Sequence, residues 1–166
     1  MNIVPRVLLM MGSDTDLPIM QEAADILKKF AVPYEMRISS AHRSPERTMA
    51  LASEAASRGV QVIIAGAGMA AHLAGVVASH TILPVIGVPM PGGALNGVDA
   101  LYATVQMPAG IPVATMAIGK AGAKNAALFA IQILALTDRS FADSLMRFRV
   151  DMDKALEIKD AELQAI

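Results

Sequence analysis

Short apolar runs alternate with longer segments of helical spacing along the chain, and this alternation constrains the fold more than any other feature. The runs are predicted strands at residues 6–11, 34–38, 61–65, 84–88 and 113–118. The segments that follow them are predicted helices at residues 16–30, 45–58, 70–79, 97–106 and 122–136. Strands that alternate with helices form a parallel sheet. The sequence therefore predicts a doubly wound α/β protein.

The composition of each run predicts its place in the sheet. Residues 34–38 alternate between apolar and charged side chains, as expected of a half-exposed edge strand, whereas residues 6–11 and 61–65 are apolar on both faces and belong in the centre. A flavodoxin-like strand order 2-1-3-4-5 satisfies both requirements. The run 113–118 then forms the other edge although it is almost wholly apolar, so we expect another subunit or the tail to cover it.

The pattern changes after Leu136. Apolar residues there recur at steps of three or four between charged residues, at Phe141, Leu145, Phe148, Met152 and Leu156. This spacing predicts an amphipathic helix. At 166 residues the chain fits one domain, and we expect a single domain over residues 1–166, with an α/β core at 6–137 and a C-terminal amphipathic helix at 138–162.

Charge is distributed unevenly along the chain. The chain has 14 Lys and Arg residues against 15 Asp and Glu residues. It therefore lacks the excess of basic residues that is typical of proteins that bind nucleic acid or anionic membranes. Between Val60 and Gly119 the only formally charged residue is Asp99. Histidines, prolines and amides interrupt this stretch before about 20 apolar residues accumulate, so no membrane-spanning helix fits. Subunit contacts explain such a surface, and the sequence predicts a homo-oligomer.

Cysteine usage and the first residues indicate the compartment. The chain has no cysteine, which excludes disulfides, thiolate nucleophiles, iron–sulfur clusters and cysteine-based zinc sites, and fits a reducing compartment. The amino-terminal residues lack the pattern of a signal peptide. We therefore expect a cytoplasmic protein.

Ligands of open parallel sheets bind beyond the carboxyl ends of the strands, near the switch in strand order, so the first three loops are the candidate site. The first loop, residues 12–16, reads GSDTD and opens a helix, whose free amides and dipole suit a phosphate. A functional Asp here would accept hydrogen bonds from ribose hydroxyls. Helix capping is the alternative explanation of Asp14 and Asp16.

The second loop places His42 and Arg43 directly before Ser44 and Pro45, which are predicted as the N-cap and first residue of the next helix. Arg43 can bind a phosphate through paired hydrogen bonds. The imidazole of His42 can transfer a proton to or from a ligand nearby. The alternative is an ordinary solvated loop, which the position at the switch in strand order disfavours.

The third loop, residues 66–72, contains the pattern G-x-G-x-x-A. A dinucleotide site is excluded, because the pattern follows the third strand and no acidic residue stands about 20 residues further on. Its small residues, Gly68 among them, permit close approach of the backbone to a flat ligand. We interpret His72, in an apolar stretch, as a structural rather than a catalytic histidine. The three histidines lie on separate elements without zinc-site spacing, so no metal is expected.

Five motifs together resemble the class I N5-carboxyaminoimidazole ribonucleotide mutases of purine biosynthesis. They are MGSDTD at 11–16, SSAHRSPE at 39–46, IIAGAGMAAHLAG at 63–75, GVPMPGGALNGVDALYATVQMP at 87–108 and AIGKAGAKNAALFAIQILA at 117–135. The resemblance implies a flavodoxin-like catalytic domain in a homo-octamer, with active sites at subunit junctions. It also implies a cofactor-independent isomerisation of a small ribonucleotide, in which the carboxylate moves from the exocyclic nitrogen to C4 and gives 4-carboxy-5-aminoimidazole ribonucleotide.

The resemblance also implies roles for six residues. His42 is the proton shuttle and the only catalytic residue assigned; Ser13 and Arg43 are phosphate ligands, Asp16 is a ribose ligand, and Ser40 and the Gly68 backbone line the ring and carboxylate pocket. The mechanism that it implies releases carbon dioxide by protonating the departing nitrogen and recaptures it at C4.

The sequence departs from the family pattern at four positions, with Met69 for a usual Gly, Ala74 for Pro, Ala109 for a frequent Arg and Ala114 for Gly. We expect Met69 to narrow the ring pocket or shift its backbone. Two alternatives stay open. One is a class II aminoimidazole ribonucleotide carboxylase that uses free carbon dioxide. The other is a non-catalytic phosphoribosyl-ligand sensor on the same fold, which would not need His42.

Overall fold

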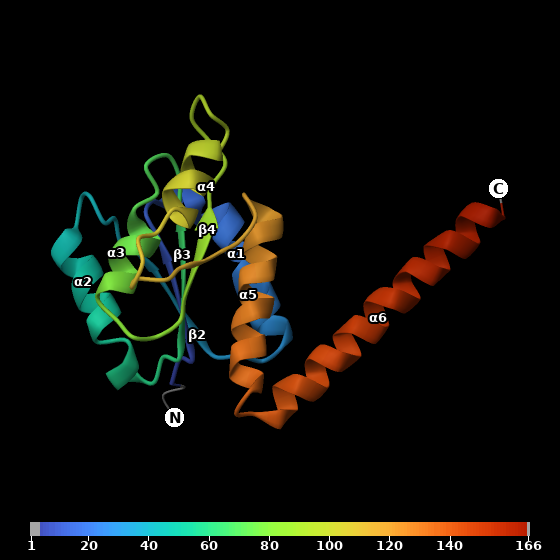
Figure 1. The fold of residues 1–166 in the computed structure, drawn as a ribbon. Helices are drawn as coiled ribbons and strands as arrows, with labels where there is room; N and C mark the ends of the chain where they lie inside the picture. Colours follow the sequence, from blue (N-terminus) through green and yellow to red (C-terminus); the bar gives the residue numbers. More distant parts are fainter. Residues whose placement is uncertain (1–3, 166) are drawn as a thin grey trace. The chain divides into compact units, whose positions relative to one another are not determined.

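A five-stranded parallel sheet organises the amino-terminal part of the chain in the computed structural model, which describes residues 4–165 (Figure 1). The strands are β1 (Val7–Met11), β2 (Tyr34–Ile38), β3 (Val62–Ala67), β4 (Val85–Pro89) and β5 (Ala114–Thr115). They pair in the order β2-β1-β3-β4-β5, and every pair is parallel. The predicted fold class and strand order are confirmed.

The register of the sheet sets where the first three loops begin. Met11, the last residue of β1, pairs with Ile38 at the end of β2 and with Gly66 near the end of β3. The three strands therefore end at the same level. The loops that follow them start side by side at one edge of the sheet, where the sequence analysis places the candidate site.

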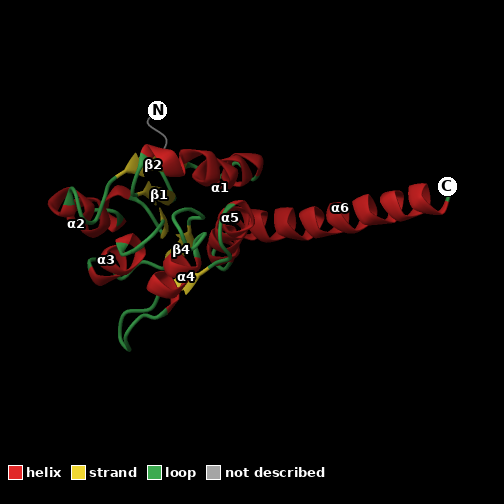
Figure 2. Ribbon diagram, turned by 90° about the horizontal axis from the view of Figure 1, so that it is seen from above, coloured by secondary structure: helices red, strands yellow, loops and turns green. Residues whose placement is uncertain are grey.

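Helices cover both faces of this sheet (Figure 2). They are α1 (Leu17–Lys29), α2 (Pro45–Ser53), α3 (Leu73–Ser79), α4 (Val98–Val105) and α5 (Lys120–Ala135), with short 3-10 helices at Asp14–Asp16 and Ala56–Arg58. The α2 and α3 helices lie on one face, and α1 and the start of α5 lie on the other. One core cluster shows the packing of the first face, where Leu8 and Ile63 of the sheet meet Ala52 of α2 and Val77 of α3. On the second face, α1 buries Met20 and Leu27, among others.

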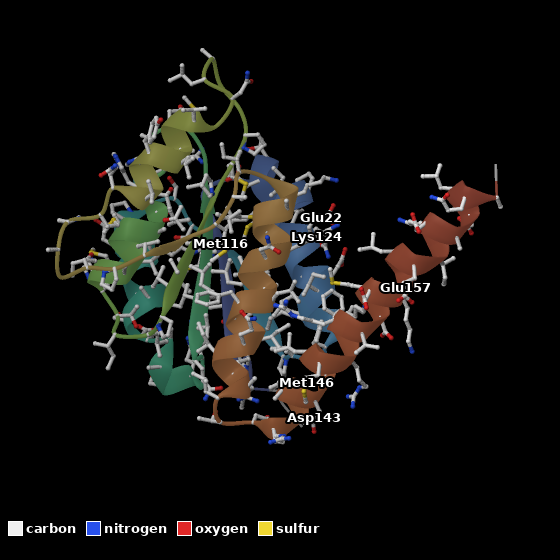
Figure 3. All side chains as sticks on the ribbon, turned by 45° about the vertical axis from the view of Figure 1, so that its right-hand side comes forward. Glu22, Met116, Lys124, Asp143, Met146 and Glu157 are labelled. Atoms are coloured by element: carbon white, nitrogen blue, oxygen red, sulfur yellow. The ribbon has the colours of Figure 1, made fainter. Side chains whose placement is uncertain are left out.

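Two ion pairs join α1 to the start of α5. The Glu22 carboxylate forms ion pairs with Lys120 Nζ at 2.9 Å and with Lys124 Nζ at 3.2 Å. Figure 3 shows Glu22 and Lys124 side by side. The hydrogen bond from Lys120, and after it that from Lys124, holds the pKa of Glu22 below its ordinary value. The first turn of α5 is therefore tied to α1 by a shared carboxylate.

The fifth strand is much shorter than predicted. It covers Ala114–Thr115 rather than residues 113–118. Beyond it, Met116 N–H still donates to Gly87 O at 2.9 Å and Gly119 N–H donates to Pro89 O at 2.9 Å. The next residue of β4 that faces this edge is Pro89, which has no N–H to continue the ladder, so the strand ends there.

From Ile131 onwards the chain forms a second compact unit, which contains the end of α5 and the helix α6 (Arg139–Gln164). Asp138 caps α6, since its carboxylate accepts from Ser140 N–H at 3.2 Å. The predicted C-terminal helix therefore exists and extends past residue 162. That residues 1–166 act as one catalytic domain stays a prediction. Among residues 4–165, no helix is both long and apolar enough to span a membrane.

Candidate active site

A cavity of about 620 Å³ opens at the carboxyl ends of β1, β2, β3 and β4. Its walls come from the four loops that follow these strands. The lining residues include all six residues predicted for the site, which are Ser13, Asp16, Ser40, His42, Arg43 and Gly68. The sequence places these residues on three separate loops. The level ends of the strands bring them to one cavity, while their individual roles stay predictions.

In the first loop, polar side chains fold back on the backbone. Ser13 Oγ accepts from Thr15 N–H at 3.4 Å, and Asp14 Oδ1 accepts from the same N–H at 3.1 Å. Ser13 is therefore the N-cap of the short 3-10 helix, and Asp14 supplies a second acceptor for the same N–H. Asp16 stands at the N-cap position of α1 but makes no side-chain capping bond there, so capping of α1 does not explain its carboxylate.

Asp16 is a partly buried acid in this loop. Burial raises the pKa of its carboxyl above the ordinary value, against the opposing effects of backbone hydrogen bonds with Ser13 and Gly12 and of the Arg43 charge. Its carboxylate is thus held in place by the loop and lines the cavity. An acceptor fixed in this way can bind hydroxyl groups of a ligand without first having to be ordered.

The second loop is a turn whose polar groups bond to one another. Ser40 N–H donates to Ser44 Oγ at 3.1 Å, Ser44 Oγ donates back to Ser40 O at 3.1 Å, and Arg43 N–H donates to Ser40 Oγ at 3.2 Å. Below the turn, the buried hydroxyls of Ser39 and Thr48 are 2.8 Å apart. Ser44 and Pro45 begin α2 as predicted. The turn therefore presents His42 and Arg43 to the cavity from a fixed backbone.

Arg43 connects the second loop to the first. Its Nη2 donates to Gly12 O at 2.8 Å. One contact uses only one of the five N–H donors of a guanidinium. The group is therefore anchored beside Ser13 while most of its donors remain available to an anion at this end of the cavity.

His42 meets a second histidine across the cavity. His42 Nε2 lies 2.8 Å from His72 Nδ1, and the two rings form an edge-to-face pair with centroids 4.9 Å apart. Both side chains are exposed. This pairing was not predicted from the sequence, and the interpretation of His72 as a structural histidine stays a prediction. The signal that could have found it is position, because His72 closes the loop after the central strand β3.

The third loop has an unusual backbone. Met69 and Ala71 both have positive φ, at 56° and 28°, and Ala71 N–H donates to Gly68 O at 3.0 Å. These left-handed residues delay the start of α3 to Leu73, three residues later than predicted. At Gly68, an added Cβ would lie 3.4 Å from Met90 Cβ. The Gly68 backbone thus forms the cavity wall directly over Met90.

Metal-binding clusters are absent from the described part of the chain. Within residues 4–165, no group of three or more His, Asp or Glu side chains is arranged to hold a metal ion. The polar side chains that line the cavity are instead one anchored cation, one held carboxylate, three hydroxyls and a pair of imidazoles. Such a set can bind an anion and exchange protons with a ligand.

Fold and site together define a flavodoxin-like α/β protein with a polar cavity at the switch in strand order. The family model of AIR carboxylase matches residues 6–155, and the chain belongs to this family.

Two relatives of high identity have the same name. An N5-carboxyaminoimidazole ribonucleotide mutase of Pyrococcus horikoshii is 55% identical over 160 residues, which are 96% of this chain and 89% of the relative. A protein of the same name from Saccharolobus solfataricus is 57% identical over 149 residues, covering 90% and 93%. Among solved structures, PurE of Treponema denticola superposes with a TM-score of 0.86 at 31% identity, covering 96% of this chain and 98% of that one.

Proposed function

We infer that this protein is an N5-carboxyaminoimidazole ribonucleotide mutase, which converts that compound to 4-carboxy-5-aminoimidazole ribonucleotide. The observation that carries the inference is the meeting of His42, Arg43 and Asp16 at one cavity, in a chain whose relatives bear the mutase name. A phosphate, a ribose and a ring that exchanges protons are the three parts of the substrate, and the cavity offers one kind of group to each.

The ribonucleotide would lie with its phosphate on the first two loops. Ser13 and Arg43 would bind the phosphate, because the guanidinium is anchored to Gly12 O beside the start of a helix. The held carboxylate of Asp16 would accept hydrogen bonds from the ribose hydroxyls. Ser40 and the Gly68 backbone would line the ring, where the missing side chain of Gly68 lets a flat group approach.

The reaction needs one proton delivered and one removed. His42 would give a proton to the exocyclic nitrogen as its bond to the carboxylate carbon breaks, and carbon dioxide leaves. C4 of the ring would then bond to this carbon dioxide, and His42 would take the C4 proton, which restores its starting state. This is general acid–base catalysis in a confined site, and no step requires a metal or a cofactor.

His72 supports this role of His42. A hydrogen bond between two imidazoles requires one nitrogen to donate and the other to accept, so the tautomers of His42 and His72 are coupled. His72 would thereby hold the ring of His42 in one orientation between the two proton transfers.

A label experiment tests the proposal. During a single forward turnover in labelled bicarbonate, the product should contain almost no label, because the carboxylate stays within the site. Complete incorporation of label would overturn the mutase assignment and favour the carboxylase that draws carbon dioxide from solution. Binding of the ribonucleotide without any turnover would favour the non-catalytic sensor.

We also propose that the protein is a cytoplasmic homo-oligomer, an octamer as the resemblance implies. Support comes from an exposed apolar stripe before and along α4, with steps of three, four and three residues, formed by Leu95, Val98, Tyr102 and Val105. A stripe of this kind is typical of a surface covered by another protein. Sedimentation at micromolar concentration should give a species several times heavier than 17.4 kDa; a monomer would contradict the proposal.

A further inference from the structure

Donor groups of the first loop, where we place the phosphate, are already bonded within the protein. Asp16 N–H donates to Ser13 O at 3.2 Å, a backbone bond that closes the short 3-10 helix. Two further donors, the Ser13 hydroxyl and Thr15 N–H, are bonded to one side chain, that of Asp14. These two donors become available to a ligand only when that side chain moves.

Asp14 holds both donors with a single oxygen. Its Oδ1 accepts from Ser13 Oγ at 3.0 Å and from Thr15 N–H at 3.1 Å. A hydroxyl has one proton to donate, so the Ser13 oxygen can only accept from other groups while it donates to Asp14. The phosphate of a ribonucleotide presents acceptor oxygens. It therefore cannot bond to the Ser13 hydroxyl until the bond to Asp14 is broken.

The position of Asp14 allows it to release these bonds. Its side chain is exposed and does not line the cavity, whereas Ser13 and Thr15 do. The charge of Asp14 nevertheless acts within the site, because burial raises the pKa of Asp16 most and the charge of Asp14 adds to this effect. A negative charge so close to the first loop also opposes a bound phosphate.

We propose that Asp14 is an internal competitor of the substrate phosphate, whose carboxylate occupies the Ser13 hydroxyl and Thr15 N–H and must give them up when the phosphate binds. This inference rests on the proposed phosphate site at Ser13 and Arg43. A ligand that binds only when its donors are free has its affinity reduced by the fraction of protein in which they are free. Asp14 thus keeps the affinity for substrate and product below what the loop can reach, and acts as a positioning residue through Ser13.

The test measures the binding of ribose 5-phosphate, which carries the phosphate and ribose of the substrate without its ring, by isothermal titration calorimetry. Asp14→Asn removes the charge and Asp14→Ala removes the acceptor, so each should bind about 3- to 10-fold more tightly than wild type. Asp25→Asn is the matched control, because Asp25 is an exposed acid of α1 that accepts from Gln21 Nε2 at 2.8 Å and lies outside the cavity. It changes the net charge equally and should bind as wild type does.

A second comparison asks whether Asp14 acts through the Ser13 hydroxyl. Ser13→Ala and the double variant Ser13→Ala with Asp14→Asn are titrated beside the single Asp14→Asn variant. The gain in affinity from Asp14→Asn should be smaller when the hydroxyl is missing. An equal gain with and without the hydroxyl would reveal an effect of charge alone and overturn the competition for this donor.

The outcomes separate this inference from the proposed function. Unchanged or weaker binding in both Asp14 variants, or an equal gain in Asp25→Asn, would overturn the role of Asp14 while a wild type that converts the substrate keeps the mutase assignment. A wild type that binds ribose 5-phosphate but converts no substrate would overturn the mutase assignment and leave the role of Asp14 standing. Disorder of the loop would weaken binding, so tighter binding does not arise from a damaged fold.

Discussion

The loops after β2 and β3 each bring a histidine to the same cavity, but they are held in different ways. Residues 39–44 form a turn in which hydroxyls and backbone groups satisfy one another. In residues 68–72, Met69 and Ala71 have a left-handed backbone without the conformational freedom of glycine. One backbone hydrogen bond lies within this loop, donated by Ala71 N–H to Gly68 O. The loop of residues 39–44 is stabilised by its own side chains, whereas the loop of residues 68–72 is held by the elements around it.

This difference assigns different duties to the two loops. A turn whose hydrogen bonds are made holds His42 and Arg43 in one geometry, as the proton transfer and phosphate binding proposed for them require. The loop of residues 68–72 instead places the bare backbone of Gly68 in the cavity wall, where a flat group can approach. Substitutions that change the function of one loop without that of the other test this difference.

The largest effect is expected at His42. His42→Asn keeps a polar side chain in the turn but cannot exchange a proton near neutral pH, so turnover should fall about 100-fold or more. Binding of the ribonucleotide should persist, because Ser13, Asp16 and Arg43 remain. Steady-state kinetics and ligand titration of the variant measure the two quantities. Turnover close to wild type would eliminate the proposed proton carrier.

The sequence predicts the second loop better than the third for a physical reason. Ser44 and Pro45 mark a helix start through local chemistry that any sequence reading can use, and α2 begins there. Nothing local to residues 68–72 indicates positive φ at Met69 and Ala71, or that His72 lies against a residue 30 positions earlier. Those features depend on Met90 below the loop and on the neighbouring strand. The early end of β5 likewise depends on its partner strand, because Pro89 of β4 has no N–H to extend the pairing.

Arg43 should give the second largest effect. Arg43→Ala removes a charge-assisted contact to phosphate and the bond to Gly12 O, and affinity for the ribonucleotide should fall about 10-fold or more. Arg47→Ala serves as the control, since Arg47 is an exposed arginine on α2 outside the cavity. Equal losses in the two variants would indicate a general charge effect rather than a phosphate ligand at Arg43.

A smaller effect is expected at Ser44. Ser44→Ala removes both bonds between its hydroxyl and the Ser40 backbone, so the free energy of unfolding should fall by about 1 kcal/mol. Chemical denaturation measures this change. Turnover should fall as well, because His42 and Arg43 lose the fixed backbone that holds them. Unchanged stability would show that the turn does not depend on its side chains.

The smallest expected effect is at Ala31, which has a positive φ of 54° and does not line the cavity. Ala31 follows α1, with its N–H donating to Lys28 O at 3.0 Å and the next N–H to Leu27 O at 2.9 Å, a helix end that favours glycine. Ala31→Gly should raise the free energy of unfolding by roughly 0.5 kcal/mol and leave kinetics unchanged. A lower free energy of unfolding in Ala31→Gly would contradict the strain at this position.

The rate of product formation by the purified protein from each ribonucleotide tests the central claim most directly. We predict fast conversion of N5-carboxyaminoimidazole ribonucleotide that does not depend on added bicarbonate, and slow conversion of aminoimidazole ribonucleotide even with bicarbonate present. Equally fast product formation from aminoimidazole ribonucleotide and bicarbonate would contradict the mutase and establish a carboxylase in the same cavity.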